Sequence, residues 1–193
     1  FTANWNATEG VDEYYLHLYA KHTAQYDETY FFTDYDFSNI ISDGTTTEPE
    51  VPNNISCEYG SWVAFLPIFA NGTLGISGEF SEKELNGYLS SPMYNLSYNN
   101  GTFNVSLSLK GNTDDYVVVN LIDSEGEIAS EQAISLPDAE WNDFSFPMQN
   151  GDEESNIEII YNGSGYLFID NLKVYQELPT GAQVSTPIIQ KLC

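Results

Sequence analysis

The chain has 193 residues with 29 acidic and five basic side chains, so its formal net charge is −24 at neutral pH. All five basic residues are lysines, and without arginine the chain lacks the bidentate clamps that recognise phosphates and carboxylates. Nucleic-acid binding is excluded because scattered lysines cannot release counterions from a phosphate backbone. No apolar run is long enough to insert directly into a membrane. The expected partners are therefore cations or neutral molecules.

The remaining composition favours a packed fold in spite of this charge. Apolar residues make up 41% of the chain, and 14 Tyr and 11 Phe are spread along it. So many aromatic residues argue against disorder, and Tyr, Phe, Val and Ile favour strands. The two cysteines, Cys57 and Cys193, are too few to define a disulfide framework, and nothing local requires them to pair.

The first 25 residues predict a hairpin of two strands. Phe1, Ala3 and Trp5 alternate with polar residues, a turn follows, and Tyr14–Leu18 alternates again. An isolated hairpin is marginal in water, so it must pack against something. The apolar stretch 184–189 near the C-terminus is the expected partner, provided that the two ends meet in space.

The middle of the chain shows a period of two, which is typical of strands. In 102–110, Phe103, Val105, Leu107 and Leu109 share one side, which predicts an antiparallel strand with one wet face. Turn signals rich in Gly, Asn and Asp separate the segments. Further strands are expected at 116–123, apolar on both faces, and at 143–148, 157–161 and 166–175, with a helical turn at 79–86. This pattern predicts an all-β sandwich, with Trp141 as a core anchor.

Two stretches resemble known families. Residues 1–16, with Trp5 and the spacing Gly10-x-x-x-Tyr14, resemble the second and third strands of a fibronectin type III domain. Leu89-Ser90-Ser91-Pro92, Trp141 and Phe168–Val174, which reads Phe-Ile-Asp-Asn-Leu-Lys-Val, resemble the jelly rolls of carbohydrate-binding-module type. Such galactose-binding-like or choice-of-anchor domains occur in bacterial surface proteins.

Together the two resemblances imply a jelly-roll β-sandwich inserted into part of a fibronectin type III-like domain. The expected division is a partial hairpin at 1–28, the jelly roll at 29–178, and a return strand at 179–193. An inserted domain needs its two ends close together. If residues 25–30 and 176–182 were far apart, this interpretation would fail.

Asp170 is the first candidate for a site, because it lies among apolar residues of the last strand and has no arginine to pair with. In the modules that this sequence resembles, an aspartate here helps to hold a structural Ca²⁺. Asp34 and Asp36 are the matching first-strand ligands. Calcium wants six to eight oxygens, so three carboxylates would not suffice alone. The alternative is that Asp170 accepts backbone N–H groups at a turn or bulge.

Candidate ligand contacts come from aromatic and polar residues near predicted loops. Sugar-binding modules place aromatic faces against pyranose rings and add polar side chains as hydrogen-bond partners. The alternative is that the aromatic residues fill the core, as they usually do in a strand-rich chain. The candidates are Glu58, Tyr59, Trp62, Tyr98, Asn99 and Asn100.

The sequence contains no catalytic motif, and its carboxylates are too numerous for one pair to stand out. We therefore expect a non-catalytic carbohydrate-binding or cell-adhesion module of a larger secreted or surface protein, monomeric as a fragment. Its partner would be a glycan or a cell-surface protein. One rival is a structural spacer or protein-interaction module stabilised by calcium. Another is a glycoside hydrolase or lyase on the same sandwich.

Overall fold

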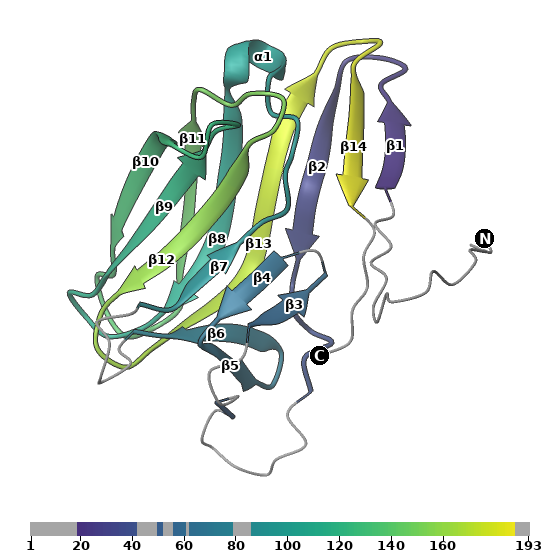
Figure 1. Ribbon diagram of the computed structural model, residues 1–193. Coiled ribbons are helices and arrows are strands. Elements are labelled where there is room, and N and C mark those ends of the chain that lie inside the picture. Colours follow the sequence, from purple (N-terminus) through teal and green to yellow (C-terminus); the bar gives the residue numbers. More distant parts are fainter. Residues whose placement is uncertain (1–18, 42–49, 52–55, 61, 79–85, 188–193) are drawn as a thin grey trace, which may run out of the picture.

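The protein is an all-β, antiparallel sandwich with a small two-stranded sheet formed near its ends (Figure 1). A computed structural model describes residues 19–41, 50–51, 56–60, 62–78 and 86–187. The elements are β1 (Tyr19–Thr23), β2 (Glu28–Tyr35), β3 (Cys57–Tyr59), β4 (Trp62–Phe65), β5 (Pro67–Ala70), β6 (Thr73–Ser77), β7 (Tyr88–Ser90), α1 (Tyr98–Gly101), β8 (Phe103–Lys110), β9 (Tyr116–Ile122), β10 (Ile128–Ser135), β11 (Asn142–Met148), β12 (Asn156–Asn162), β13 (Tyr166–Leu178) and β14 (Gln183–Pro187).

Two sheets form the sandwich. The first has the order β10-β9-β12-β7-β4-β3 and is called the β9 sheet here. The second, the β8 sheet, has the order β11-β8-β13-β6-β5. The long strand β13 pairs with β8 along one edge, while its other edge pairs with β6 near its start and with β2 near its end.

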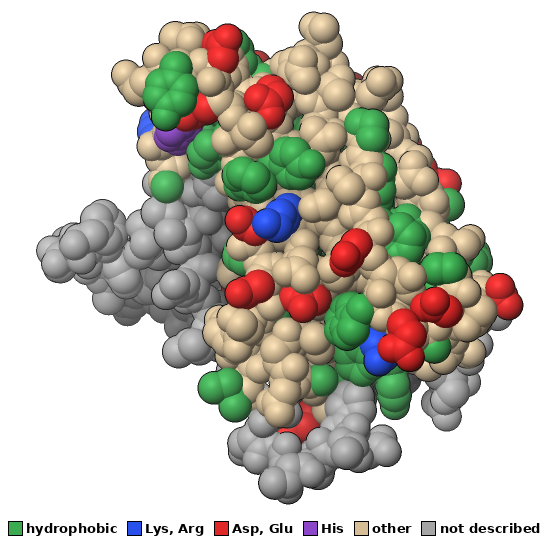
Figure 2. Space-filling view, turned by 180° about the vertical axis from the view of Figure 1, so that it is seen from behind, with side chains coloured by type: hydrophobic (Ala, Val, Ile, Leu, Met, Phe, Trp, Pro, Cys, Tyr) green, Lys and Arg blue, Asp and Glu red, His purple; other side chains and the backbone are tan. Residues whose placement is uncertain are grey.

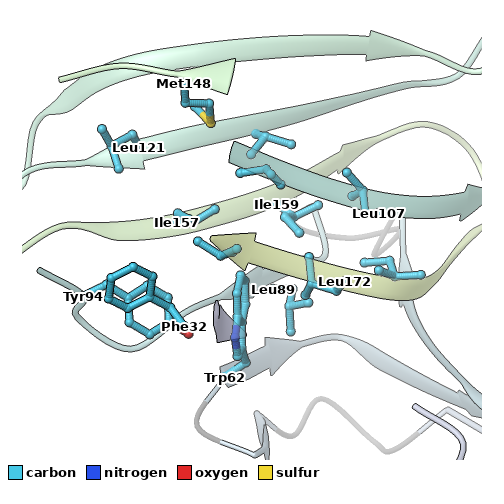
Figure 3. Packing of buried hydrophobic residues seen from close by; sticks show 14 of the residues in the cluster. Phe32, Trp62, Leu89, Tyr94, Leu107, Leu121, Met148, Ile157, Ile159 and Leu172 are labelled. Atoms are coloured by element: carbon cyan, nitrogen blue, oxygen red, sulfur yellow. The ribbon is translucent and has the colours of Figure 1, made fainter. Parts of the chain in front are cut away.

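The predicted alternation is confirmed in the strands that fill the core. Phe103, Val105, Leu107 and Leu109 of β8 are all buried between the sheets. The both-sided apolar segment 116–123 is β9, which has a hydrogen-bonded neighbour on each side, as expected for an inner strand. Apolar side chains from both sheets meet in one cluster, part of which is drawn in Figure 3.

One end of this core contains a small hydrogen-bonded polar group. Trp62 is 1% exposed, and its Nε1–H donates to Thr33 Oγ1 at 3.0 Å. Thr33 Oγ1 is also 2.6 Å from the Tyr94 hydroxyl, and the Tyr94 ring lies 5.2 Å from that of Phe32. Figure 3 shows these rings together at one side of the cluster. The buried polar atoms are thus paired, which is the condition for placing them in a core.

The two ends of the sandwich lie side by side. β1 pairs with β14, and Thr23 is opposite Gln183 (Figure 1). Asp27 Oδ1 accepts the N–H of Thr180 at 2.8 Å, and β2 runs antiparallel to the end of β13. The condition for an inserted domain is therefore met. The boundaries and the fibronectin identity of the flanking strands stay predictions.

Some expectations need a correction, and others concern residues outside the described part of the chain. Trp141 does not anchor the core: it is 41% exposed, because it precedes β11 at the end of its sheet. Cys57 is disulfide-bonded, which no local pattern required, and the other cysteine, Cys193, lies outside the described residues. The hairpin expected before Tyr19 and most of the helical turn expected at 79–86 also lie outside them.

No helix in the described part of the chain is long and apolar enough to cross a membrane.

Candidate functional site

The predicted ligand residues lie in separate parts of the structure. Trp62 points into the core, where its indole N–H is already bonded to Thr33, so it cannot meet a surface ligand. This corrects the prediction for Trp62 in favour of core filling. Tyr59 packs edge-on against Tyr35 at 6.0 Å and donates its hydroxyl to Asn39. Desolvation, with the charge of Asp36 adding to it, raises the pKa of Tyr59 to about 12.

A second group of predicted residues lies at the α1 end of the molecule, far from β3 in Figure 1. The Tyr98 hydroxyl donates to the carbonyl of Gln183 and accepts the N–H of the same residue, both at 2.9 Å. Tyr98 therefore fastens β14 to the sandwich. Asn99 and Asn100 are exposed and have left-handed backbone conformations, with φ of 50° and 53°. These three residues do not join Glu58 and Tyr59 in one site.

Glu58 does belong to a larger surface, the outer face of the β9 sheet, which we call the β9 face. Because strand residues alternate, those between the buried ones point away from the core. Two neighbouring rows cross this face in register. The apolar row is Ala133, Val118, Ile160, Tyr88 and Phe65. The polar row is Glu131, Asn120, Glu158, Ser90, Val63 and Glu58.

The apolar row ends in an aromatic pair. The rings of Phe65 and Tyr88 are stacked at 5.4 Å with an interplanar angle of 20°. Both are partly exposed, as are Ile160 and Val118 beside them. An outer sheet face is normally polar, so a contiguous apolar row there indicates a surface that binds something.

Asn120 lies at the centre of the polar row. Its side chain is on the outer side of β9, between Glu131 and Glu158, yet it is only 4% exposed. Its carbonyl oxygen Oδ1 is buried and accepts no hydrogen bond. An unmade bond of this kind costs about 1–3 kcal/mol, so such groups are rare in folded proteins. Because Oδ1 is buried, a ligand hydroxyl can reach it only if the side chains around it move.

Each of the three predicted calcium ligands contacts another group of the protein. Asp34 is opposite Lys173, and Lys173 Nζ lies 3.1 Å from its Oδ1. Asp36 Oδ1 accepts the N–H of Ser38 at 3.1 Å, and Asp170 Oδ1 accepts that of Asn171 at 2.7 Å. Asp170 thus makes the backbone contact that was the alternative to metal binding. Within the described ranges, no three His, Cys, Asp or Glu side chains are grouped to hold a metal. Calcium stays a prediction, which a calcium titration with thermal melting would test.

The pKa of Asp170 is shifted in the opposite direction to that of Asp36, which the Ser38 N–H lowers. Partial burial raises the pKa of Asp170, the Asn171 N–H lowers it, and the charge of Asp36 raises it further, with a net shift upward. The two carboxylates are thus close enough to repel each other. The side chain is only half-buried, on the outward side of β13, so it is not the core acid that the sequence suggested.

The sequence reasoning missed Asn120, Glu158, Tyr88 and Phe65. A signal for Asn120 was present, since it is the polar residue inside the otherwise apolar run Tyr116–Ile122. The side-chain amide of an asparagine in such a run must either form hydrogen bonds within the core or lie on the surface. Tyr88 and Phe65 gave no comparable signal, because they meet only through the long-range pairing of β4 with β7.

The chain matches no protein-family model and no curated protein sequence. Among solved structures it is similar to a CBM4 structure, with 17% identity and a TM-score of 0.46 over 70% of this chain and 99% of the other. A variant of a family 29 carbohydrate-binding module is 14% identical, with a TM-score of 0.47 over 77% and 92%. The cleaved adhesin domain of Lys-gingipain from Porphyromonas gingivalis is 12% identical, with a TM-score of 0.48 over 77% and 99%. At these identities and TM-scores the likeness carries no argument about a ligand.

Proposed function

We propose that the protein is a non-catalytic glycan-binding module whose ligand lies on the β9 face. The observation that supports this most directly is the contiguous apolar row on the outer face of the β9 sheet, which ends in the stacked rings of Phe65 and Tyr88. Asn120, in the polar row beside it, has a buried carbonyl oxygen without a partner in the described structure. Such a module acts outside the cell, as a part of a larger surface protein.

The two rows of the β9 face match the two sides of a sugar ring. The carbon-bound hydrogens of a pyranose form an apolar surface that would pack on Phe65 and Tyr88. Its hydroxyl groups would donate to the carboxylate of Glu158 and, after the side chains around it move, to Asn120 Oδ1 beside it in the polar row. Ser90, whose Oγ accepts the amide of Asn156 at 3.1 Å, adds a hydroxyl to the same row.

The charges of this face favour a neutral glycan. Glu58, Glu131 and Glu158 lie in the polar row, and neither row contains a lysine or histidine. A uronic acid or a sulfated sugar would place its negative charge beside these carboxylates and would be repelled. Neutral polysaccharides such as glucans, xylans and mannans carry no such penalty.

The proposal is tested with a panel of soluble neutral polysaccharides by affinity electrophoresis, followed by calorimetry with oligosaccharides of the best one. Tyr88→Ala and Asn120→Leu should each weaken binding at the β9 face by about ten-fold or more, which corresponds to roughly 1.4 kcal/mol. Tyr166→Ala is the matched control, because Tyr166 is 42% exposed and lies on the other sheet.

Two results would count against the proposal. If the parent protein binds no glycan of the panel, the function is wrong. If it binds one but Tyr88→Ala and Asn120→Leu bind as well as the parent at every site, the β9 face is the wrong place. Release of reducing ends during the same incubations would contradict the non-catalytic part and support a hydrolase.

A further inference from the structure

The outer face of the β8 sheet, the β8 face, contains a shallow open depression of about 440 Å³. We call it the β8 trough, and its lining is Ser106, Leu107, Ser108, Asp143, Phe144, Ser145, Asn171 and Lys173. Its shape follows from side-chain length. The outward residues at the middle of β8 are short serines, whereas the flanking strands β11 and β13 contribute the longer Asp143 and Lys173. Figure 2 looks onto the molecule from this side, where charged side chains lie among green and tan ones.

The floor of the β8 trough is a fixed polar network. Ser108 is only 5% exposed, and its hydroxyl donates to Asp143 Oδ1 at 2.6 Å. Ser108 Oγ also accepts a hydrogen bond from the side-chain amide of Asn171 at 3.3 Å. Asn171 reaches it from a bulge of β13, where its backbone is left-handed with φ of 49°. These bonds hold one carboxylate and one amide in place before any ligand arrives, which reduces the entropy cost of binding.

The other side of the β8 trough combines an ammonium group with aromatic rings. Lys173 is opposite Ser106 in the register of β13 and β8, and Ser106 is opposite Ser145 of β11. Lys173 Nζ lies 5.9 Å from the centroid of Phe31. Phe31 is 44% exposed, and its ring lies 5.2 Å from that of Tyr175. A partly exposed aromatic pair therefore lies beside a cavity with hydroxyl, carboxylate, amide and ammonium groups.

We propose that the β8 trough is a second glycan-binding site, separate from the β9 face, which takes one or two units of a neutral saccharide. The volume falls in the range of small-ligand sites. Asp143 and the serine oxygens can accept hydrogen bonds from sugar hydroxyls, and Asn171 and Lys173 can donate them. The carboxylates of Asp34 and Asp143 outnumber the ammonium of Lys173, so an acidic sugar is not favoured. This inference uses the proposed function only for the class of ligand.

Two sites on opposite faces of one sandwich give the protein a property that a single face lacks. The β9 and β8 sheets lie back to back, so their outer faces point in opposite directions (Figure 1). Each site would bind a different polysaccharide chain, and the protein would cross-link the two. In a network of polysaccharide chains, engagement of both sites also raises the apparent affinity by roughly 10²–10⁴ without any new contact.

Calorimetry with a short neutral oligosaccharide tests the second site through stoichiometry. The parent protein should bind two ligands per chain. Asp143→Ala should bind one, Tyr88→Ala on the β9 face should bind one, and the double variant should bind none. Because Asp143 anchors Ser108, Lys173→Met provides a second variant of the β8 trough that leaves this network intact, and urea unfolding of each variant confirms that it folds.

The outcomes separate the two proposals. One ligand per parent chain, lost in Tyr88→Ala and kept in Asp143→Ala and Lys173→Met, would overturn the second site and leave the proposed function standing. One ligand that is lost in the two β8-trough variants and kept in Tyr88→Ala would overturn the β9 face instead. If the parent protein has two sites, it should also precipitate a soluble polysaccharide, and each single-face variant should not.

Discussion

The two outer faces of the sandwich differ in how they depart from an ordinary wet sheet. The β8 face follows the rule along β8, where Asn104, Ser106 and Ser108 alternate with buried apolar residues. The β9 face breaks the rule, because Val118 of β9 and Ile160 of β12 are apolar and point outward. Under the two proposals, the β9 face would bind mainly through apolar contact and the β8 trough mainly through polar contact.

Two side-chain amide oxygens among the described residues are buried and lack a hydrogen-bond partner, and they sharpen this contrast. Gln176 is 0% exposed and points inward, and its Nε2 donates to the carbonyls of Leu96, Tyr98 and Thr102. Gln176 thus ties the loop around α1 to β13, and its spare oxygen is incidental. Asn120 has the same unpaired oxygen on an outer face. One amide has a structural task that is visible in its bonds, whereas the other lacks a partner for its acceptor.

The largest expected effect comes from the core that both faces share. Trp62→Ala should lower the free energy of unfolding by about 3–5 kcal/mol, because it removes a large buried side chain and leaves Thr33 and Tyr94 without its N–H. Binding at both faces should then weaken together as the protein unfolds. Urea denaturation followed by tryptophan fluorescence or circular dichroism measures the change in stability.

Trp141→Ala is the matched control for Trp62→Ala. Trp141 is 41% exposed, so its replacement should cost less than about 1 kcal/mol. Equal losses for the two tryptophans would contradict the assignment of Trp62 to the core and Trp141 to the surface.

The second effect distinguishes the two amides. Gln176→Leu should lower the free energy of unfolding by roughly 1–3 kcal/mol, because it leaves buried carbonyls without a donor. Asn120→Leu should leave stability unchanged or raise it, because it removes an unpaired buried oxygen from among apolar and partly buried neighbours. Parallel urea titrations measure both. A loss for Asn120→Leu as large as that for Gln176→Leu would show that Asn120 is structural.

Sequence patterns predicted the strands that are long and one-sided. The alternation of 102–110 specified both β8 and its buried side, and the both-sided run 116–123 specified an inner strand. The strands between Cys57 and Ser90 have only three to five residues each, which is too short for a period to stand out. β10 was missed because the apolar residues of Ile128–Ser135 stand in adjacent pairs instead of alternating, and only Ile134 is buried.

The candidate site was less accessible to prediction, because it depends on register. Val118, Ile160 and Tyr88 are far apart in the chain and become neighbours only when β9, β12 and β7 pair. The aromatic residues that the sequence made prominent, Trp62 and Tyr59, are used in packing instead. Residue type alone could therefore name candidates for a sugar contact but could not assign them to a face.

The third prediction concerns the pH dependence of the β8 face. Because the pKa of Asp170 is raised in the folded state, its ionisation disfavours folding, and stability is lost as the pH rises through the interval above the ordinary value of 3.8. Asp170→Asn removes this effect. The variant should match the parent below that value and become more stable than the parent above it, as measured by thermal melting across a pH series.

Asp36→Asn provides the check on the cause. Removing the charge of Asp36 should reduce the shift of the Asp170 pKa, because repulsion between the two carboxylates contributes to it. The parent and Asp36→Asn should then differ in the same pH interval, by less than the parent and Asp170→Asn. A parent whose stability instead rises through this interval relative to Asp170→Asn would mean that the Asp170 carboxylate is stabilised, as a bound cation would do.

The smallest effect on stability, and the clearest test of how the two faces differ, comes from the ion pair of Asp34 with Lys173. Both side chains are partly exposed, so Asp34→Asn should change the free energy of unfolding by less than about 1 kcal/mol. The same change releases the Lys173 ammonium at the β8 trough and should let this site accept an acidic sugar, while the β9 face continues to reject it.

Calorimetry with a uronic-acid oligosaccharide, compared between the parent and Asp34→Asn, measures this gain in binding. If the acidic ligand binds both proteins equally, charge does not select the ligand of the β8 trough. Two double variants then locate the gained binding. If Asp34→Asn combined with Tyr88→Ala loses it and Asp34→Asn combined with Asp143→Ala keeps it, the acidic ligand binds at the β9 face. In that case the two faces do not differ in their selection by charge.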